Sequence, residues 1–114
     1  MFTIRPFNPT DAEYEAIYAV EKAVYPENAE TVADFKHGDA IRKPGHFFQR
    51  LVVEQDGRLI AFASASHPPE TKNPGRYRFR VTVLPEFERR GVGTAVYHQI
   101  WQTLQTREPR PTIL

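Results

Sequence analysis

The sequence predicts an α/β domain of the α+β kind, with its elements in the order β-α-α-β-β-β-α-(β). Alternating apolar residues, which are typical of strands, mark two neighbouring segments, His46–Glu54 and Arg58–Ser66. Asp56 and Gly57 lie between these segments, and an Asp-Gly pair in this position indicates a tight antiparallel hairpin. Apolar residues at helical spacing, before and after the hairpin, indicate amphipathic helices.

The composition is that of one small globular domain that covers residues 1–114. Hydrophobic residues make up 40% and aromatic residues 12% of the chain, which favours a packed core over disorder. The net charge of +1 does not indicate a nucleic-acid partner, and without cysteine there is neither a disulfide nor a thiolate zinc site. No segment approaches the roughly 20 apolar residues that cross a membrane, so we expect a soluble, cytoplasmic protein with no membrane partner.

The first elements are a strand and a helix. Phe2–Phe7 alternates and is bounded by prolines, which predicts a short strand. Thr10 precedes Glu13 by three positions, the spacing of a capping box at the start of a helix. We expect this helix over Asp11–Tyr25, because Pro26 stops it. Its apolar stripe consists of Ile17, Val20 and Val24.

A short helix and a further strand are also expected. Thr31 and Asp34 repeat the cap spacing and predict a helix to about His37, which Gly38 ends. After the hairpin, Arg76–Leu84 alternates again and predicts the next strand. Its apolar face consists of Tyr77, Phe79, Val81 and Val83.

The segment after this strand carries the clearest functional signal. A turn at Pro85 leads to Arg89 and Arg90, and then Gly91 and Gly93 open a long amphipathic helix. The apolar stripe of this helix consists of Val96, Tyr97, Ile100, Trp101 and Leu104. The first turn of a helix presents free N–H groups and the positive end of the helix dipole, which attract anions. Glycines let the backbone approach phosphate oxygens closely, so this segment predicts a phosphate-bearing ligand.

The same segment resembles the acetyl-CoA-binding motif of the GNAT superfamily of N-acetyltransferases. That motif is a strand ending in Val-x-Val, a proline, and a Gln/Arg-x-x-Gly-x-Gly/Ala run that opens a helix. The matching positions are Val81 and Val83 in the strand, then Pro85, Arg90, Gly91 and Gly93. Glu88 occupies the position where the family has Gln or Arg, and Arg89 lies beside it.

The resemblance implies that acetyl-CoA is a co-substrate whose acetyl group passes directly to a primary amine of a small molecule or peptide. By this resemblance the residues that contact the coenzyme are Val81, Val83, Arg89, Arg90, Gly91, Val92, Gly93 and Thr94. The backbone N–H of Val83 matches the group that binds the thioester carbonyl in the family. Glu21 is a candidate general base, because its helix borders the acceptor groove in the family. The alternative for Glu21 is a plain carboxylate at the edge of this helix.

The resemblance covers nearly the whole chain and implies a mixed, mainly antiparallel sheet with helices on both faces. In the family a strand after the long helix runs parallel to the Val81–Val83 segment and splays from it, and acetyl-CoA lies between the two. Only Arg110–Leu114 could form that strand here. We therefore expect an incomplete GNAT domain that is completed by a following domain, as in tandem members, or by a second copy in a homodimer. The alternative is a catalytically degenerate GNAT half that binds CoA or only supports a partner domain or subunit.

Several other polar residues have two interpretations. Arg76, Arg78 and Arg80 share one face of their strand. They are either a basic surface for an anionic acceptor or nucleic acid, or a solvated face paired with carboxylates such as Glu54, and we expect the second. We expect Tyr77 in the core, because a phenol with an ordinary pKa of about 10 is a poor base. The histidines, which show no metal-ligand spacing and predict no metal site, are His37, His46, His67 and His98.

Overall fold

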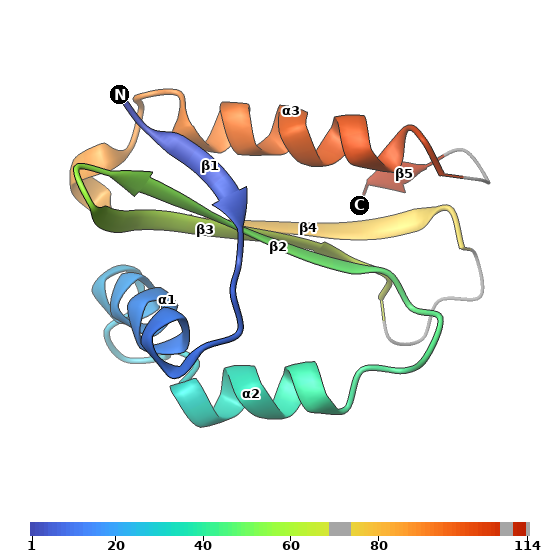
Figure 1. The fold of residues 1–114 in the computed structure, drawn as a ribbon, viewed down its shortest axis with the longest axis horizontal. Helices are drawn as coiled ribbons and strands as arrows, with labels where there is room; N and C mark the ends of the chain where they lie inside the picture. Colours follow the sequence, from blue (N-terminus) through green and yellow to red (C-terminus); the bar gives the residue numbers. More distant parts are fainter. Residues whose placement is uncertain (69–73, 108–110, 114) are drawn as a thin grey trace.

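The computed structural model describes residues 1–68, 74–107 and 111–113. Within these residues the sheet has five strands in the order β1-β2-β3-β4-β5 (Figure 1). The strands are β1 (Thr3–Pro6), β2 (Phe48–Gln55), β3 (Arg58–Ser66), β4 (Arg76–Val83) and β5 (Thr112–Ile113). The helices are α1 (Asp11–Val24), α2 (Val32–Ala40), α3 (Val92–Leu104) and the short 3-10 helix η1 (Pro85–Phe87). Neighbouring strands pair antiparallel, except that β5 runs parallel to β4.

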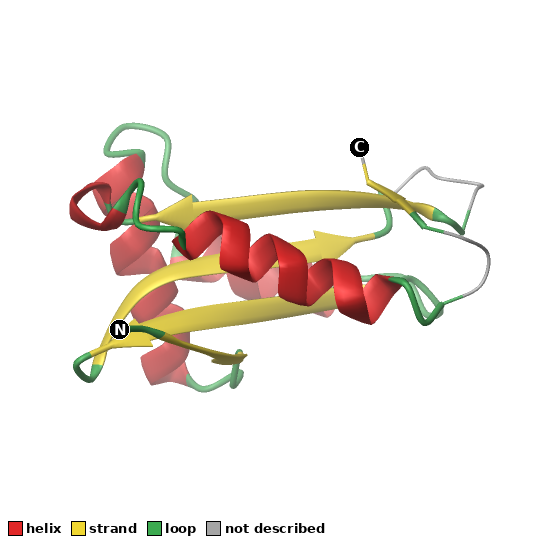
Figure 2. Cartoon of the chain, turned by 90° about the horizontal axis from the view of Figure 1, so that it is seen from above, coloured by secondary structure: helices red, strands yellow, loops and turns green. Residues whose placement is uncertain are grey.

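Helices cover both faces of the sheet. Figure 1 shows α1 and α2 below the strands and α3 above them, and Figure 2 shows α3 lying along the upper face. This arrangement confirms the expected mixed, mainly antiparallel sheet with helices on both sides. In the described part of the chain, no helix is long and apolar enough to cross a membrane.

The helix starts follow their capping residues. The Thr10 hydroxyl accepts a hydrogen bond from the Glu13 N–H at 3.2 Å. The Thr31 hydroxyl likewise accepts a hydrogen bond from the Asp34 N–H at 3.1 Å, and the Asp34 carboxylate accepts one from the Thr31 N–H at 3.0 Å. The box of α2 is therefore complete, as expected. In α1 only half of the expected box forms, because the Glu13 carboxylate binds the Arg5 guanidinium at 2.8 Å instead.

The prediction that Gly38 ends α2 is wrong. The helix continues beyond Gly38, and the Ile41 N–H closes its last turn on the His37 carbonyl at 3.1 Å. A glycine ends a helix by adopting the left-handed conformation, and Gly38 stays outside that region. By contrast, Asp56 (φ 55°) and Gly57 (φ 75°) are both left-handed, as a two-residue hairpin turn requires. The predicted hairpin between β2 and β3 is therefore confirmed.

Both helix layers bury one stripe of side chains against the sheet. The buried apolar residues of α3 recur at a spacing of four and are Val92, Val96, Ile100 and Leu104. Those of α1 are Tyr14, Ile17 and Val20. Tyr97, which we expected in the stripe of α3, is 37% exposed although its ring contacts Phe79. Tyr77 of β4 is 0% exposed, which confirms its place in the core.

A mostly buried ion pair fixes α2 against the sheet. Asp39 of α2 accepts hydrogen bonds from both terminal nitrogens of Arg50 in β2, at 2.9 and 3.2 Å. It also accepts one from the Tyr14 hydroxyl at 2.7 Å and pairs with Arg42 at 3.0 Å. The Arg50 side chain is 7% exposed, and its guanidinium lies 4.9 Å from the ring centre of Phe48. Burial alone would raise the pKa of Asp39, but the hydrogen bonds from Arg50 and Tyr14 outweigh it and hold this pKa below its usual value.

Replacing Asp39 by Asn leaves the buried Arg50 charge without its partner. We expect the free energy of unfolding at neutral pH to fall by about 3 kcal/mol, measured by urea denaturation. The lowered pKa means that the contribution of Asp39 is present above the unfolded pKa of about 3.9 and is lost as the pH falls through the folded value. The difference in free energy of unfolding between wild type and variant should therefore become smaller in acid. Asp56→Asn makes the same chemical change in an exposed turn and should have little effect. If this difference in free energy stayed constant as the pH falls, the stabilising role of the Asp39 carboxylate would be contradicted.

Candidate functional site

Every second N–H group of β4 points toward the edge that faces β5. In an antiparallel pair, residues alternate between those that hydrogen-bond to the neighbouring strand and those whose backbone groups point away. The Leu84 N–H, just after β4, donates to its β3 partner at 2.9 Å, so the even-numbered residues of this strand face β3. On the other side, the Thr112 N–H donates to the Gly75 carbonyl at 2.6 Å, so the odd-numbered residues face β5. Val81 and Val83 therefore direct their N–H groups to the β5 side.

The β5 side of β4 is covered only at its beginning. β5 pairs with Arg76 and Tyr77, and no other described strand lies beside β4 on this side. At the C-terminal end of β4, next to η1 and the start of α3, the strand edge therefore has no described strand beside it (Figure 1). The N–H groups of Val81 and Val83 face this open edge. The parallel pairing confirms the expected direction of the last strand, whereas Arg110 and Leu114 of the expected segment lie outside the described residues.

The turn after β4 presents a run of free backbone N–H groups. The Glu88 N–H closes η1 on the Pro85 carbonyl at 3.3 Å, and the next N–H with a partner is that of Ala95, which binds the Gly91 carbonyl at 3.0 Å. Between them, six N–H groups donate to no residue that the structure describes: those of Arg89, Arg90, Gly91, Val92, Gly93 and Thr94. Arg89 (φ 61°) and Gly91 (φ 80°) are left-handed, a conformation that gathers successive N–H groups into an anion-binding concavity. We call these six residues the N–H cradle.

The space in front of the N–H cradle is open. A Cβ atom at Gly91 or Gly93 would meet no other atom within 4 Å. Gly91 is needed for its positive φ, but Gly93 lies in the first turn of α3 with no such requirement. Neither packing nor backbone conformation accounts for a glycine at this position. Close approach of a ligand to the helix N-terminus does account for it.

The charges around the N–H cradle favour an anion. Arg89 and Arg90 are exposed, and neither forms an ion pair with any described residue. The Arg90 guanidinium lies 5.7 Å from the ring centre of Phe87, and the nearby Glu86 pairs with Arg58 at 3.7 Å. Both cradle arginines are therefore available to bind phosphate oxygens.

Glu21, the candidate base, is buried and has both oxygens engaged. Its side chain is 2% exposed, Oε1 accepts from Arg80 at 2.6 Å, and Oε2 accepts the Glu30 N–H at 3.1 Å. The Glu30 carboxylate binds the same guanidinium at 2.9 Å. These contacts are compatible with the alternative of a plain carboxylate without a catalytic role, although the side chain is buried rather than at a solvated helix edge. Among the strand arginines, Arg80 pairs with carboxylates as expected, but these are Glu21 and Glu30. The named example, Glu54, lies beside β1 and pairs with Arg5 instead.

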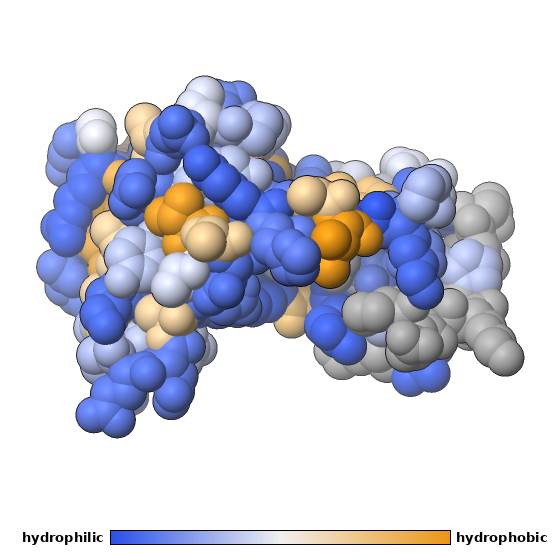
Figure 3. Space-filling model, turned by 90° about the horizontal axis from the view of Figure 1, so that it is seen from below, coloured by the Kyte–Doolittle hydropathy of each residue, from blue (hydrophilic) through white to orange (hydrophobic). Residues whose placement is uncertain are grey.

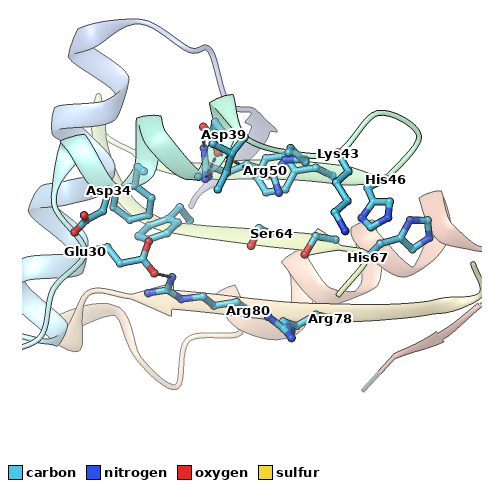
Figure 4. Close-up of a pocket in the computed structure, with 17 residues that line it drawn as sticks. Glu30, Asp34, Asp39, Lys43, His46, Arg50, Ser64, His67, Arg78 and Arg80 are labelled. Carbon is cyan, nitrogen blue, oxygen red and sulfur yellow. Dashed lines mark hydrogen bonds and ion pairs between the residues drawn. The ribbon is translucent and has the colours of Figure 1, made fainter. Parts of the chain in front are cut away.

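A groove lies on the α2 side of the sheet, and of its lining residues the sequence analysis considered only Arg78 and Arg80 as possible ligand contacts. It has a volume of about 480 Å³ (Figure 4). Side chains from β3 and β4 form its floor, among them Phe62, Ser64, Ser66, Arg78 and Arg80. The wall comes from α2 and the loop after it, through residues such as Asp39, Lys43 and His46. Seen from this side, the molecule is largely hydrophilic with two small apolar patches (Figure 3).

His67, at one end of the groove, has a structural role. Its Nδ1 accepts the Phe47 N–H at 3.0 Å, and its Nε2 lies 2.8 Å from the Pro74 carbonyl, so Nε2 carries the proton. The ring stacks on Tyr77 with centroids 4.8 Å apart. Because both nitrogens are engaged, His67 is not free to accept a proton from a substrate. In the described ranges, no group of three or more His, Asp or Glu side chains could hold a metal ion.

Comparison with known families gives one match. The profile of the acetyltransferase (GNAT) family matches residues 12–108. No curated protein matches the chain.

Solved structures with a similar fold include several acetyltransferases. The Escherichia coli ribosomal-protein-S18-alanine N-acetyltransferase has a TM-score of 0.69 at 18% identity, over 94% of this chain and 61% of that one. A tandem GNAT protein from the clavulanic acid biosynthesis pathway has a TM-score of 0.78 at 18% identity, over 99% of this chain and 35% of that one. A GNAT family acetyltransferase from Brucella melitensis, in complex with acetyl-CoA, has a TM-score of 0.67 at 24% identity, over 93% of this chain and 70% of that one. The chain thus spans less than two thirds of the first two structures.

Replacing Gly93 by Ala tests the N–H cradle without disturbing the fold. The variant should be at least as stable as the wild type, because alanine favours a helix by up to about 1 kcal/mol over glycine. The added methyl group should keep a pyrophosphate away from the N–H groups and weaken coenzyme A binding by about tenfold or more, measured by calorimetry. Gly38→Ala also adds a methyl group into open space within a helix, but on the opposite face of the sheet, and should leave affinity unchanged. Equal affinity of Gly93→Ala and wild type would exclude this site.

Proposed function

The chain belongs to the GNAT family of acetyltransferases, and we propose that it transfers an acetyl group from acetyl-CoA to a primary amine. One observation carries this proposal: an open strand edge with free N–H groups runs directly into the N–H cradle. Acetyl-CoA has a pyrophosphate for an anion site and an extended, amide-containing arm that can bind a strand edge. The open strand edge and the N–H cradle lie next to each other, so one acetyl-CoA molecule could bind the first with its arm and the second with its pyrophosphate.

In the proposed complex the pyrophosphate accepts hydrogen bonds from the N–H cradle. The positive end of the α3 dipole and the guanidinium groups of Arg89 and Arg90 balance its charge. The arm of the coenzyme lies along the open edge of β4, beyond the part that β5 covers. The Val83 N–H binds the thioester carbonyl, and the Val81 N–H is a second donor on the same edge.

The proposed reaction is a direct transfer with no covalent enzyme intermediate. The neutral amine nitrogen attacks the thioester carbon, and the carbonyl oxygen takes up negative charge beside the Val83 N–H. A donor aimed at this oxygen lowers the barrier, and so does holding both substrates together. The carbon–sulfur bond then breaks, the coenzyme leaves as a thiolate, and a proton lost from the amine nitrogen neutralises it.

Before the attack, the ammonium form of the acceptor must lose a first proton to become the neutral amine, and this step does not require Glu21 in our proposal. Both oxygens of Glu21 are engaged, one of them by Arg80, so its contacts favour a role in positioning that arginine. The groove on the α2 side is open, and we propose that solvent within it takes this first proton from the ammonium group, whereas the proton lost after the attack neutralises the thiolate.

We also propose that another polypeptide segment completes the sheet. β5 is the last strand of the described sheet, so its edge away from β4 has no described strand beside it, and such edges pair readily with another strand. The segment comes either from a following domain or from a second copy of this chain. A tandem protein of the family has a similar fold over 35% of its length, which is compatible with the first arrangement.

An ester in place of the peptide bond before Val83 removes one N–H group and tests the proposed chemistry. With acetyl-CoA and a panel of primary amines, the wild type should release coenzyme A thiol in an amine-dependent reaction. The ester variant should bind the coenzyme nearly as well as the wild type, but its rate of acetyl transfer should be at least about 100-fold lower. An ester before Thr82, whose N–H faces β3, should instead lower stability. Coenzyme binding without any transfer by the wild type would favour the catalytically degenerate alternative, and an unchanged rate in the ester variant would exclude the role of Val83.

The oligomeric state tests whether a second copy completes the sheet. Size-exclusion chromatography with light scattering should show a dimer of this chain if that arrangement is correct. The acetyl-transfer assay should be run on the same fractions. A stable monomer with full turnover would show that no additional segment is required.

A further inference from the structure

The groove on the α2 side has opposite charges at its two ends. Five cationic and three acidic side chains contribute to its lining. Figure 4 shows Glu30 and Asp34 together at one end, near the α1–α2 connection. Lys43 and Arg78 lie toward the other end, next to the two histidines of the groove. A molecule that binds along the groove would meet a different charge at each end.

The acidic end has more carboxylates than cations. Arg80 is shared between Glu21 and Glu30, so one positive charge serves two negative charges. Asp34 adds another carboxylate, which accepts a hydrogen bond from the Thr31 N–H of its own helix cap. This end therefore suits the ammonium form of an amine before it loses its proton.

The basic end has cations without partners. Arg78 is exposed, and it forms no ion pair with any residue in the described ranges. The same holds for Lys43, in the loop that follows α2. The nearest acidic side chain in the wall, Asp39, is already bound by Arg42, Arg50 and Tyr14. Ser64 lies on the floor between the two ends (Figure 4), and Ser66 also lines the groove.

We propose that this groove binds the acceptor and that the acceptor is an amine that also carries a carboxylate or phosphate group. The anionic group binds Arg78 and Lys43, and the amine lies toward Glu30 and the open edge of β4. This inference rests on the proposed acetyl transfer. Arg78 and Val83 are five residues apart on one strand, which corresponds to about 17 Å at ~3.3 Å per residue. The acceptor is therefore an extended molecule, such as a short peptide, rather than a free amino acid.

Three matched peptides test the inference: tetra-alanine, its C-terminal amide, and the amide with phosphoserine as its last residue. Calorimetry on the whole chain, with and without coenzyme A, measures binding independently of catalysis. Tetra-alanine should bind about tenfold or more tightly than its amide, and added salt should reduce this preference. The phosphoserine peptide distinguishes a phosphate site from a carboxylate site.

Arg78→Gln should abolish the preference for the anionic peptide, and Arg78→Lys should restore part of it. Arg76→Gln removes the same charge from the same strand outside the groove and should leave the preference intact.

The outcomes separate this inference from the proposed function. Acetylation of the amide at the same rate as both anionic peptides would leave the transferase function standing and overturn the anionic acceptor. Selective binding of an anionic peptide that Arg78→Gln abolishes, without any acetylation, would support the binding site and overturn the transferase function. If none of the peptides binds, or if Arg78→Gln leaves the preference unchanged, the inference is wrong.

Discussion

The site depends on the alternating direction of peptide groups along β4. One set of its backbone groups is used by β3, and the other set faces β5, which reaches only as far as Tyr77. The closed end is well fixed, because the Tyr77 ring is buried and stacks on His67, and the Tyr77 hydroxyl accepts a hydrogen bond from the Arg107 Nε at 2.8 Å. Arg107 follows α3, so this contact also ties the end of that helix to the beginning of β4. The strands are therefore held together at one end and leave β4 open at the other.

The position of the N–H cradle follows from the same arrangement. α3 begins directly after the turn that follows β4, and its stripe from Val92 to Leu104 packs it along the sheet. The free N–H groups of its first turn therefore lie next to the open strand edge. The other face of β4 carries Arg78 and Arg80 into the groove beside α2. Coenzyme and acceptor could thus reach the same strand from different sides, which direct transfer between two bound substrates requires.

Sequence reasoning succeeded where the relevant contacts are local. The hairpin at Asp56 and Gly57, the cap at Thr31 and the run of glycines after β4 depend on residues a few positions apart, and their conformations follow from residue type. It failed for charges whose partners lie far away in the chain. Glu21 and Arg80 are separated by 59 positions, and only the packing of α1 on the sheet brings them together. The groove was likewise not predictable, because its wall depends on how α2 docks through Asp39. The end of α2 was missed because Gly38 can continue a helix as well as end one.

The most direct test of this account is an amide NMR titration of the protein with coenzyme A. In the proposed complex, the backbone of one strand and one turn, rather than any reactive side chain, forms the coenzyme site. The amide signals of Val81, Val83 and the N–H cradle should shift together and saturate at one affinity, and their hydrogen exchange should slow. The amides of Thr82 and Arg80, which face β3, should keep the slow exchange of paired groups in both states. Shifts confined to the groove beside α2, with no change in the N–H cradle, would contradict the central claim.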